Sequence, residues 1–384
     1  MYRIIISPEW YPNKENVLSA IFTKKHVEII ARKHKVVVAF AMVSKFEKKR
    51  YNLVIEDRNY TTVICYFRAS KLPFLNKYID FLNYFIAHHK AIKKAYSILV
   101  KVDFFHIHVL PKAAIIPFLY YYLFKNVPYF ISEHSTIYIR QTSGFFESRI
   151  KRLLAKYSKG ISAVSNSLKL AMIDNSLTHA NFKIIPNVVD VDVFTVKSVS
   201  VKKIINFLHV SRLEEVAKNT IGILNTFDLL FKKYQNIQLH IVGGLNNMIS
   251  DAELYSNHLN SKKNIFFHGV KLGKEIVPFY HYADYFVMFS NYETQAVVIL
   301  EALSCGLPII ATKLPALDEY LHAGNSLQVN VKDETELFNN MEACITNSYS
   351  FWKSENISAE IKVKFNINNI DRNFNDLYHK GLNF

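Results

Sequence analysis

The sequence contains little glycine, cysteine and tryptophan for its length. Its 384 residues include 10 glycines, 10 prolines, 3 cysteines and 2 tryptophans. The cysteines, Cys65, Cys305 and Cys344, are far apart and odd in number, which argues against a disulfide framework and against a zinc site built on cysteine. Such cysteine usage is typical of a reducing compartment, and we expect a cytoplasmic location.

Long apolar stretches are also absent. The longest apolar run, residues 113–124, contains Pro117 and is shorter than the roughly 20 residues that a membrane-spanning helix needs. The N-terminal apolar segment is interrupted by Pro8, Glu9 and Trp10, which argues against a signal peptide. The sequence shows no repeat and no low-complexity tract, so we expect a soluble or peripheral protein.

The composition is that of a folded chain with a large core. Half of the residues are hydrophobic, and a content this high argues against an intrinsically disordered chain. A chain of this length has room for two domains of ordinary size.

Positive charge is concentrated in the first half of the chain. The net charge is +15 overall, yet residues 1–200 carry an excess of 17 positive charges and the remainder an excess of 2 negative ones. The basic residues alternate with Phe and Tyr in Phe74–Tyr96, a mixture suited to an anionic membrane surface. We favour peripheral contact of the N-terminal domain with such a membrane; a solvated basic surface is the plain alternative, and we expect no nucleic acid.

The most informative stretch is Tyr285–Thr312. A short apolar strand over residues 285–289 precedes a polar turn and then a helix over residues 295–305, for which Thr294 is a candidate N-cap. Gly306 and Pro308 end the helix, and a second strand follows to Thr312. This pattern predicts one strand–helix–strand unit of a parallel sheet.

Two glutamates in this stretch have chemical significance. Glu301 has apolar or small helical neighbours, so its carboxylate would need hydrogen-bond donors in place of water. Glu293 lies on the loop before the helix, at the carboxyl end of a strand, where open α/β sheets bind ligands. Together with the free N–H groups of the helix N-terminus, the two carboxylates predict a site for a phosphate and for sugar hydroxyls.

Two cations are expected beside the glutamates. Arg212 and Lys218 follow a predicted strand over residues 204–210, so both would lie at the carboxyl edge of the same sheet. Cations held there could bind a diphosphate and stabilise it as a leaving group.

Strands and helices alternate along the whole chain. The predicted strands are residues 2–7, 36–42, 62–68, 104–108, 129–132, 161–167, 204–210, 238–243, 264–269, 285–289 and 308–312. The predicted helices are residues 18–33, 76–100, 113–124, 295–305, 315–321 and 370–382.

The motif around the glutamates resembles a known family. Two glutamates separated by seven residues, the second of which begins E-A-L-S-C-G-L-P-I-I-A-T, look like the donor-site signature of family 4 retaining glycosyltransferases. That resemblance implies the GT-B architecture, an α/β fold with two Rossmann-like domains facing a cleft. It also implies an enzyme that moves a sugar from a nucleotide-sugar donor to an acceptor.

The resemblance implies a domain organisation. Residues 1–190 would bind the acceptor, residues 191–365 would bind a UDP- or GDP-linked sugar, and residues 366–384 would form a helix that packs back on the first domain. A hinge is expected at about residues 190–200, just past Pro186-Asn187, which resembles the family linker.

The resemblance also assigns roles to single residues. Glu301 would accept the ribose hydroxyls, and His134, in Pro128-Tyr-Phe-Ile-Ser-Glu-His134, would contact the donor sugar. The residues expected to be catalytic are Glu293, His134, Arg212 and Lys218. Those expected to bind the donor are Glu301, Arg212, Lys218, Gly269, Val270, Thr294, Gln295, Ala296 and Val297.

The sequence departs from the family pattern at several glycines. Ala20, Val188 and Ser211 stand where the family usually has glycine, as do Pro315 and Ala316. Arg212 and Lys218 are also one residue further apart than is usual.

The resemblance implies retaining chemistry without a cofactor or a protein nucleophile. We also expect no metal, because the Asp-x-Asp sequence Asp190-Val191-Asp192 lies in the linker and not near the expected diphosphate site. The acceptor is expected to be a glycan or a polyprenyl- or lipid-linked glycan of cell-surface polysaccharide synthesis (capsule, exopolysaccharide or lipopolysaccharide) at the inner face of the cytoplasmic membrane. An inverting transferase or an epimerase remains an alternative and would need a carboxylate base, for which Glu133 is the candidate. A non-catalytic basic membrane-binding protein is the alternative outside enzymology.

Overall fold

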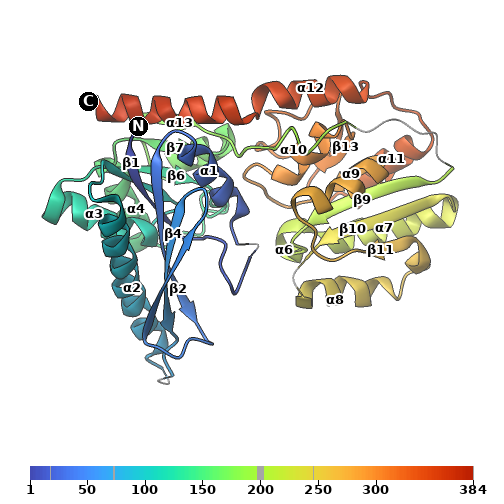
Figure 1. Cartoon of the computed structure of the whole chain (residues 1–384). Helices are drawn as coiled ribbons and strands as arrows, with labels where there is room; N and C mark the ends of the chain where they lie inside the picture. The colour runs from blue at the N-terminus through green and yellow to red at the C-terminus, as the bar shows by residue number, and fades with distance from the viewer. Residues whose placement is uncertain (18, 72–73, 197–202, 245, 384) are drawn as a thin grey trace. The chain divides into compact units, whose positions relative to one another are not determined.

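The chain folds into two compact units, shown in Figure 1. This computed structural model describes residues 1–17, 19–71, 74–196, 203–244 and 246–383. Unit 1 comprises Met1–Val188 and Asn368–Phe384, and unit 2 comprises Val189–Ile367. The expected divisions were after residues 190 and 365, and the last part of the expected hinge, from residue 197, lies outside the described residues.

Unit 1 is built on an eight-stranded sheet. Its spatial order is β3 (Tyr51–Asp57), β4 (Thr61–Arg68), β2 (Lys35–Ser44), β1 (Arg3–Pro8), β5 (Phe104–His108), β6 (Tyr129–Glu133), β7 (Ile161–Ala163) and β8 (Phe182–Ile184). Strand β3 pairs antiparallel with β4, and the other neighbours pair in parallel. The sequence did not predict β3, an edge strand in which every residue is half-buried or exposed and which therefore lacks a buried apolar run.

Helices cover both faces of this sheet. They are α1 (Ile21–Ala31), α2 (Asn76–Leu99), α3 (Lys112–Leu119), the π-helix η1 (Tyr120–Lys125), α4 (Phe145–Tyr157), α5 (Asn166–Asp174) and α13 (Ile367–Leu382). Alternate strand residues point to opposite faces. One face packs against apolar residues of α2, α3, α4 and α5, and the other carries α1 and α13.

Unit 2 is built on a six-stranded parallel sheet. Its order is β11 (Ile265–Phe267), β10 (Ile237–Gly243), β9 (Ile205–Ser211), β12 (Tyr285–Met288), β13 (Ile309–Thr312) and β14 (Ser326–Val329). Its helices are α6 (Glu215–Lys218), α7 (Thr220–Lys233), α8 (Asn246–Ser256), α9 (Val277–Tyr282), α10 (Val297–Ser304), α11 (Glu334–Ile345) and α12 (Ser354–Lys364), with 3-10 turns η2 (Lys262–Asn264) and η3 (Gly273–Glu275).

The unit 2 sheet is buried on both faces, as its apolar strands predict. Phe207 packs with α7 and α11 on one face, and its neighbour Leu208 packs with α9, α10 and α12 on the other. Each fully buried large side chain contributes about 1.5–3 kcal/mol to folding. The predicted α/β fold with Rossmann-like sheets is thereby confirmed.

The C-terminal helix α13 belongs to unit 1, although it follows α12 of unit 2 directly. Its buried residues recur at helical spacing, with Ile370, Phe374, Leu377 and Tyr378 facing the sheet. The Tyr378 ring lies 4.7 Å from that of Phe104 on β5. This helix therefore completes the core of unit 1.

Candidate functional site

The strand order of unit 2 reverses next to β9. Strand β10 lies on one side of β9 and β12 on the other, so the loops that follow β9 and β12 leave the same edge of the sheet in opposite directions. Open α/β sheets bind ligands at such a switch point, beyond the carboxyl ends of the strands. The loop after β9 leads to Arg212 and Lys218, and the loop after β12 carries Glu293.

Lys218 and Glu293 meet at this edge. Lys218 Nζ donates to Glu293 Oε1, and Ser290 Oγ donates to the same oxygen at 2.9 Å. The side chain of Glu293 is 9% exposed and that of Lys218 is 17% exposed. The structure thus joins two of the predicted residues that lie 75 positions apart, and it leaves the ammonium group partly open to a ligand.

Arg212 is not part of that ion pair. Its guanidinium is exposed and pairs with Glu214 at 3.1 Å. The next residue, Leu213, has a left-handed backbone with φ of 55°. The arginine therefore lies on the loop that was predicted for it, with its side chain turned to a neighbour on the same loop.

The loop that carries Arg212 is held by His209, which the sequence analysis did not identify. His209 Nδ1 donates to the backbone oxygen of Val287 at 2.9 Å, because a carbonyl can only accept. Its Nε2 then accepts from Ser211 Oγ at 2.8 Å, and that oxygen accepts from Leu213 N at 3.0 Å. Burial lowers the pKa of His209 to about 4, which keeps the ring neutral.

Glu301 is held by a tyrosine from another helix. Glu301 lies on α10 and is 9% exposed. Tyr280, on α9, donates its hydroxyl to Glu301 Oε2 at 3.0 Å. Burial raises the pKa of Tyr280 well above its usual value, and the Glu301 charge raises it further, so the phenol stays protonated and remains a donor. The hydrogen-bond donor that the sequence required for this carboxylate is Tyr280.

The start of α10 differs from the prediction. The helix begins at Val297 and not at Gln295, and its N-cap position is Ala296, with φ of 53°, so the assignment of Thr294 as the N-cap is wrong. Tyr320 Oη donates to the backbone oxygen of Gln295. The Tyr320 side chain, which is not part of α10, thus fixes the backbone just before the helix. The chain then turns at Ala296, and the first N–H groups of the helix follow.

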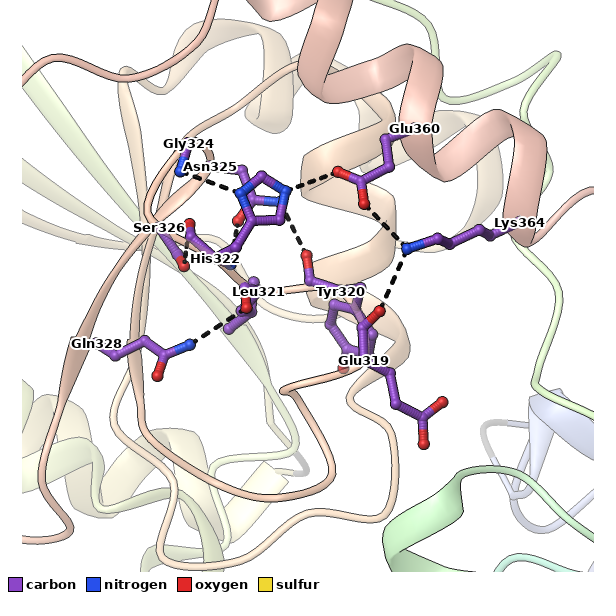
Figure 2. Close-up of polar contacts among 10 residues, drawn as sticks. All are labelled: Glu319, Tyr320, Leu321, His322, Gly324, Asn325, Ser326, Gln328, Glu360 and Lys364. Carbon is purple, nitrogen blue, oxygen red and sulfur yellow. Dashed lines mark hydrogen bonds and ion pairs between the residues drawn. The ribbon is translucent and has the colours of Figure 1, made fainter.

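The segment that carries Tyr320 is fixed to α12. Figure 2 shows His322 Nε2 next to Glu360 Oε2, at 2.8 Å, and Lys364 Nζ next to Glu360 Oε1, at 3.0 Å. Asn325 Nδ2 donates to the backbone oxygen of Tyr320 at 2.8 Å. The predicted helix over residues 315–321 is a series of turns instead, because polar side chains and α12 satisfy its backbone groups.

Gly269 lies just beyond β11 at the same edge. It has φ of 64°, and a Cβ atom built on it would have no neighbour within 4 Å. Its backbone oxygen accepts from Gly243 N at 2.8 Å. The next residue, Val270, is exposed. The glycine therefore presents an open backbone surface to solvent, on the β10 side of the switch point.

In unit 1, the ends of β5 and β6 bring three histidines together. His134 follows β6, His108 ends β5, and His26 comes from α1; all three are buried. His108 Nδ1 and His134 Nε2 share a hydrogen bond of 3.1 Å, and His26 Nε2 donates to the backbone oxygen of Pro186 at 3.1 Å. The ring of Phe22 stacks on that of His134 at 4.6 Å.

These three rings are neutral. Burial lowers the pKa of His26 to about 4 and lowers those of His108 and His134 well below their usual value. One ring nitrogen from each lies within 4.8 Å of the others, so a cation that prefers imidazole could be held here after small movements. To bind one, the shared hydrogen bond of His108 and His134 would have to open. His134 therefore has a fixed position within unit 1.

Glu133 is fully buried beside His134. Its carboxylate accepts from Leu110 N at 2.7 Å, from Tyr138 Oη at 3.1 Å and from His134 N at 3.2 Å. Burial raises the pKa of Glu133 to about 7. A carboxyl group with these partners and no exposed surface is suited to hold the loops after β5 and β6, and less suited to remove a proton from an acceptor.

Residues 205–347, most of unit 2, match the model of the family Glycosyl transferases group 1. A curated protein, the alpha-monoglucosyldiacylglycerol synthase of Streptococcus pneumoniae, is 29% identical over 104 residues. This alignment covers 27% of the present chain and 23% of the synthase.

The fold is similar to that of several solved structures over nearly the whole chain. The Anabaena protein HepE, in complex with UDP and glucose, has a TM-score of 0.74 at 15% identity and covers 99% of this chain and 100% of its own. The sucrose-phosphate synthase of Thermosynechococcus elongatus has a TM-score of 0.76 at 16% identity, with 98% of both chains covered. The lipopolysaccharide outer core galactosyltransferase WaaB has a TM-score of 0.67 at 14% identity, with 98% and 99% covered. The chain therefore has the GT-B fold, and residues 205–347 of its second unit match the family Glycosyl transferases group 1.

Proposed function

We propose that the protein is a retaining glycosyltransferase of family 4 that uses a nucleotide-sugar donor bound by unit 2. The observation that carries the proposal is the carboxyl edge of the unit 2 sheet. One switch point there is surrounded by the Lys218–Glu293 pair, the start of α10 and the open backbone of Gly269. The buried carboxylate of Glu301 lies on α10. A nucleotide sugar needs diphosphate donors, hydroxyl acceptors and space for a base.

Each predicted residue has a role in this proposal. Glu301, held by Tyr280, accepts the ribose hydroxyls, because a fixed carboxylate can take both. Lys218 and Arg212 bind the diphosphate and stabilise the leaving group; for this the arginine has to leave Glu214. Glu293 binds sugar hydroxyls or steadies charge near the anomeric carbon. Gly269 and Val270 meet the base, and Thr294, Gln295, Ala296 and Val297 line the donor sugar and the phosphate.

Unit 1 binds the acceptor and supplies His134 in this proposal. The acceptor attacks from the face that the leaving group departs, and the leaving phosphate takes the acceptor proton. Two protein cations and helix N–H groups supply the positive charge that the diphosphate needs, so we propose that the reaction requires no metal. The proposed division is residues 1–190 for the acceptor, 191–365 for the donor and 366–384 as the returning helix.

We propose a UDP- or GDP-linked sugar as the donor, and the similar proteins support the UDP-linked form and a product at the cell surface. HepE has been seen with UDP and with UDP-glucose, one relative is named for a glucosyldiacylglycerol product, and WaaB is named for the lipopolysaccharide outer core. We accordingly propose a glycan or polyprenyl- or lipid-linked acceptor of capsule, exopolysaccharide or lipopolysaccharide synthesis.

We also propose that the protein works in the cytoplasm, at the inner face of the membrane. Among the described residues, no helix combines the length and apolar character needed to cross a bilayer. The charge excess of the first half of the chain supports contact with anionic lipid and not insertion.

The inverting transferase or epimerase is the weaker candidate, because Glu133 is buried and accepts from four donors. The anomeric configuration of the product separates it from the retaining enzyme: nuclear magnetic resonance of an early product should show the configuration of the donor. A non-catalytic membrane-binding protein would bind no nucleotide.

The direct test is thermal stabilisation by UDP, GDP, ADP and CMP, with and without EDTA. We expect one nucleotide to stabilise the protein equally in both conditions. The Glu301→Gln variant should lose about 10- to 100-fold in affinity, since a hydrogen bond to a charged group contributes roughly 1.5–3 kcal/mol. Glu253→Gln, an exposed carboxylate of α8, is the matched control. If no nucleotide stabilises the wild type, the transferase proposal is wrong.

A further inference from the structure

One helical layer of unit 1 exposes large apolar side chains to solvent. The layer consists of α2, α3 with η1, and α4, whose inner sides pack against the same face of the sheet through Ala91, Ala113 and Leu154. On the outer side the exposed apolar residues are Tyr78 and Leu82 of α2, Tyr122 and Leu123 of η1, and Phe145, Phe146, Ile150 and Leu153 of α4. Contiguous apolar surface of this kind marks an interaction site.

Helix α4 has its polarity partly reversed. Phe146 is 80% exposed, whereas Lys151 is 1% exposed. The Lys151 ammonium lies 2.6 Å from Glu147 Oε1 and donates to Ser143 Oγ at 3.1 Å, so the buried charge is paired. A helix that buries a lysine and exposes phenylalanine has apolar side chains available to contact another apolar surface, such as the interior of a lipid layer.

The exposed surfaces of η1 and α4 are continuous. The ring of Tyr157 on α4 lies 6.0 Å from that of Tyr122 and 5.8 Å from that of Phe118 on α3. Leu153 is one helical turn before Tyr157 on the same side of α4. The apolar patch therefore extends from Phe146 along α4 to η1.

Basic residues border this patch. Arg149, Arg152 and Lys156 of α4 are exposed, and Lys90, Lys93 and Lys94 are exposed on the second half of α2. The two acidic residues of these helices are engaged: Asp80 accepts from Ser70 N at 2.8 Å, and Glu147 pairs with Lys151. Arg152 and Lys156 also line a pocket beside α4.

We propose that this layer is a membrane-docking surface for an anionic bilayer, with α4 and η1 placing Phe146, Ile150, Leu153 and Leu123 at the boundary of the acyl chains. The proposal rests on the proposed function in one respect, that a lipid-linked acceptor is met at the membrane. It identifies the part of unit 1 that makes the contact.

A bilayer fits this surface better than other occupants. In a symmetric dimer the same patch faces itself, which would bring the basic residues of α4 against each other. Single-stranded nucleic acid could stack on exposed rings such as Phe146 and Tyr122, but it makes no use of the aliphatic side chains Ile150 and Leu153 that lie between the rings. Anionic lipid provides the opposite charge and the apolar phase together.

The test is binding of the full chain to vesicles of phosphatidylcholine alone and of phosphatidylcholine mixed with phosphatidylglycerol. We expect binding to the mixed vesicles that weakens with salt. The triple variant Phe146→Ser, Ile150→Ser, Leu153→Ser should bind at least ~10-fold more weakly. The triple variant Leu229→Ser, Leu254→Ser, Val331→Ser, whose changes remove exposed apolar residues from unit 2, should bind like the wild type.

Three outcomes would overturn the docking surface. The first is that both triple variants bind vesicles equally well, and the second is that binding does not depend on phosphatidylglycerol. The third is that the wild type forms a dimer, or a complex with single-stranded RNA, that the α4 variant does not form. Nucleotide-induced stabilisation, measured on the same proteins, separates this from the proposed function. If it is retained while vesicle binding is absent, only the docking surface fails; if it is absent while vesicles bind, only the transferase proposal fails.

Discussion

At the scale of single residues, the candidate site consists of polar groups that each need a partner from another element. Glu293 is held by Lys218 and Ser290, Glu301 by Tyr280, and the loop before Lys218 by His209. Leaving a buried polar group without its hydrogen-bond partner lowers the free energy of unfolding by about 1–3 kcal/mol. These contacts therefore position the site as well as stabilise it.

Tyr280→Phe tests the fixation of Glu301. Removing the hydroxyl leaves the carboxylate with one donor fewer and freer to rotate, so we expect nucleotide affinity to fall about 5- to 20-fold and unfolding free energy to fall by about 1–2 kcal/mol. Calorimetric titration and chemical denaturation measure the two effects.

Tyr285→Phe is the matched control, because it removes a hydroxyl that donates to the backbone oxygen of Cys344 at 3.3 Å. It should cost similar stability and leave nucleotide affinity unchanged. Equal affinity losses in the two variants would contradict a specific role for Tyr280.

Gly269→Ala tests whether the backbone beyond β11 meets the nucleotide. Gly269 and Gly273 have φ of 64° and 54°, and neither would bring a Cβ within 4 Å of another atom. Alanine should therefore cost each position about 1 kcal/mol of strain. Only Gly269→Ala should weaken nucleotide binding, by roughly tenfold, because a methyl group would occupy the space of the base. If Gly273→Ala weakens it equally, the contact lies elsewhere.

Sequence alone could select some of these residues and not others. Glu293, Glu301 and Lys218 stood out because charged groups interrupted apolar or turn segments in a recognisable order. Tyr280 and Tyr320 resemble ordinary core aromatics in the sequence. Their partners lie 21 and 25 positions away, so only folding brings the hydroxyls to the site.

At the scale of helices and strands, the spacing of apolar residues in the sequence predicted those elements whose apolar residues lie on one side. Helix α13 is an example, with its buried residues at regular helical spacing. Helix α4 was not predicted. It buries Lys151 together with Leu154 and Ala155, whereas Phe146 and Ile150 are exposed, so apolar residues lie on both of its sides. A periodic pattern identifies an apolar side but does not say which phase will cover it.

Phe374→Ala tests the place of α13 in the fold. Its ring packs 5.0 Å from His26 and 5.5 Å from His106, within unit 1. We expect the unfolding free energy of unit 1 to fall by about 3–5 kcal/mol, as for other buried aromatics. Hydrogen exchange should show faster exchange in the unit 1 strands and no change in unit 2.

The control on the same helix is Arg372→Ala, at an exposed position, which should change neither unit. Faster exchange in unit 2 after Phe374→Ala would show that α13 supports both units, contrary to the expectation.

At the scale of the whole molecule, buried histidines make stability depend on pH. Burial lowers the pKa to about 4 for His26 and about 3 for His88 and His106, and lowers those of His108 and His134 as well. Above pH 6.5 these rings are neutral in both states. Below it the unfolded chain takes up protons that the folded chain refuses, so stability falls as pH falls toward 4.

This effect is concentrated in unit 1. His26 alone should remove on the order of 3 kcal/mol between pH 6.5 and 4. Glu133, with its pKa raised to about 7, acts in the opposite direction, because it favours the folded state as pH falls from 7 toward 4.5. Five histidines outweigh one carboxyl, so unit 1 should unfold before unit 2 on acidification.

Thermal unfolding followed by hydrogen exchange at pH 7, 6 and 5 measures this prediction. His26→Phe, which keeps an aromatic ring without a titrating group, should flatten the pH dependence of unit 1. A pH dependence unchanged by this substitution would show that other groups control acid stability.

The sequence by itself determined the α/β fold, because that fold depends on local periodicity. From a short ordered motif it also predicted two domains and the charged residues of the donor site. Only the tertiary structure decided which side chains hold them. His209 reaches its partner across the sheet, Tyr280 reaches its partner between two helices, and Tyr320 reaches from a turn to the loop before α10. The tertiary structure also decided that Phe146 and Ile150 of α4 face outward, because what covers a side depends on the neighbours that folding provides.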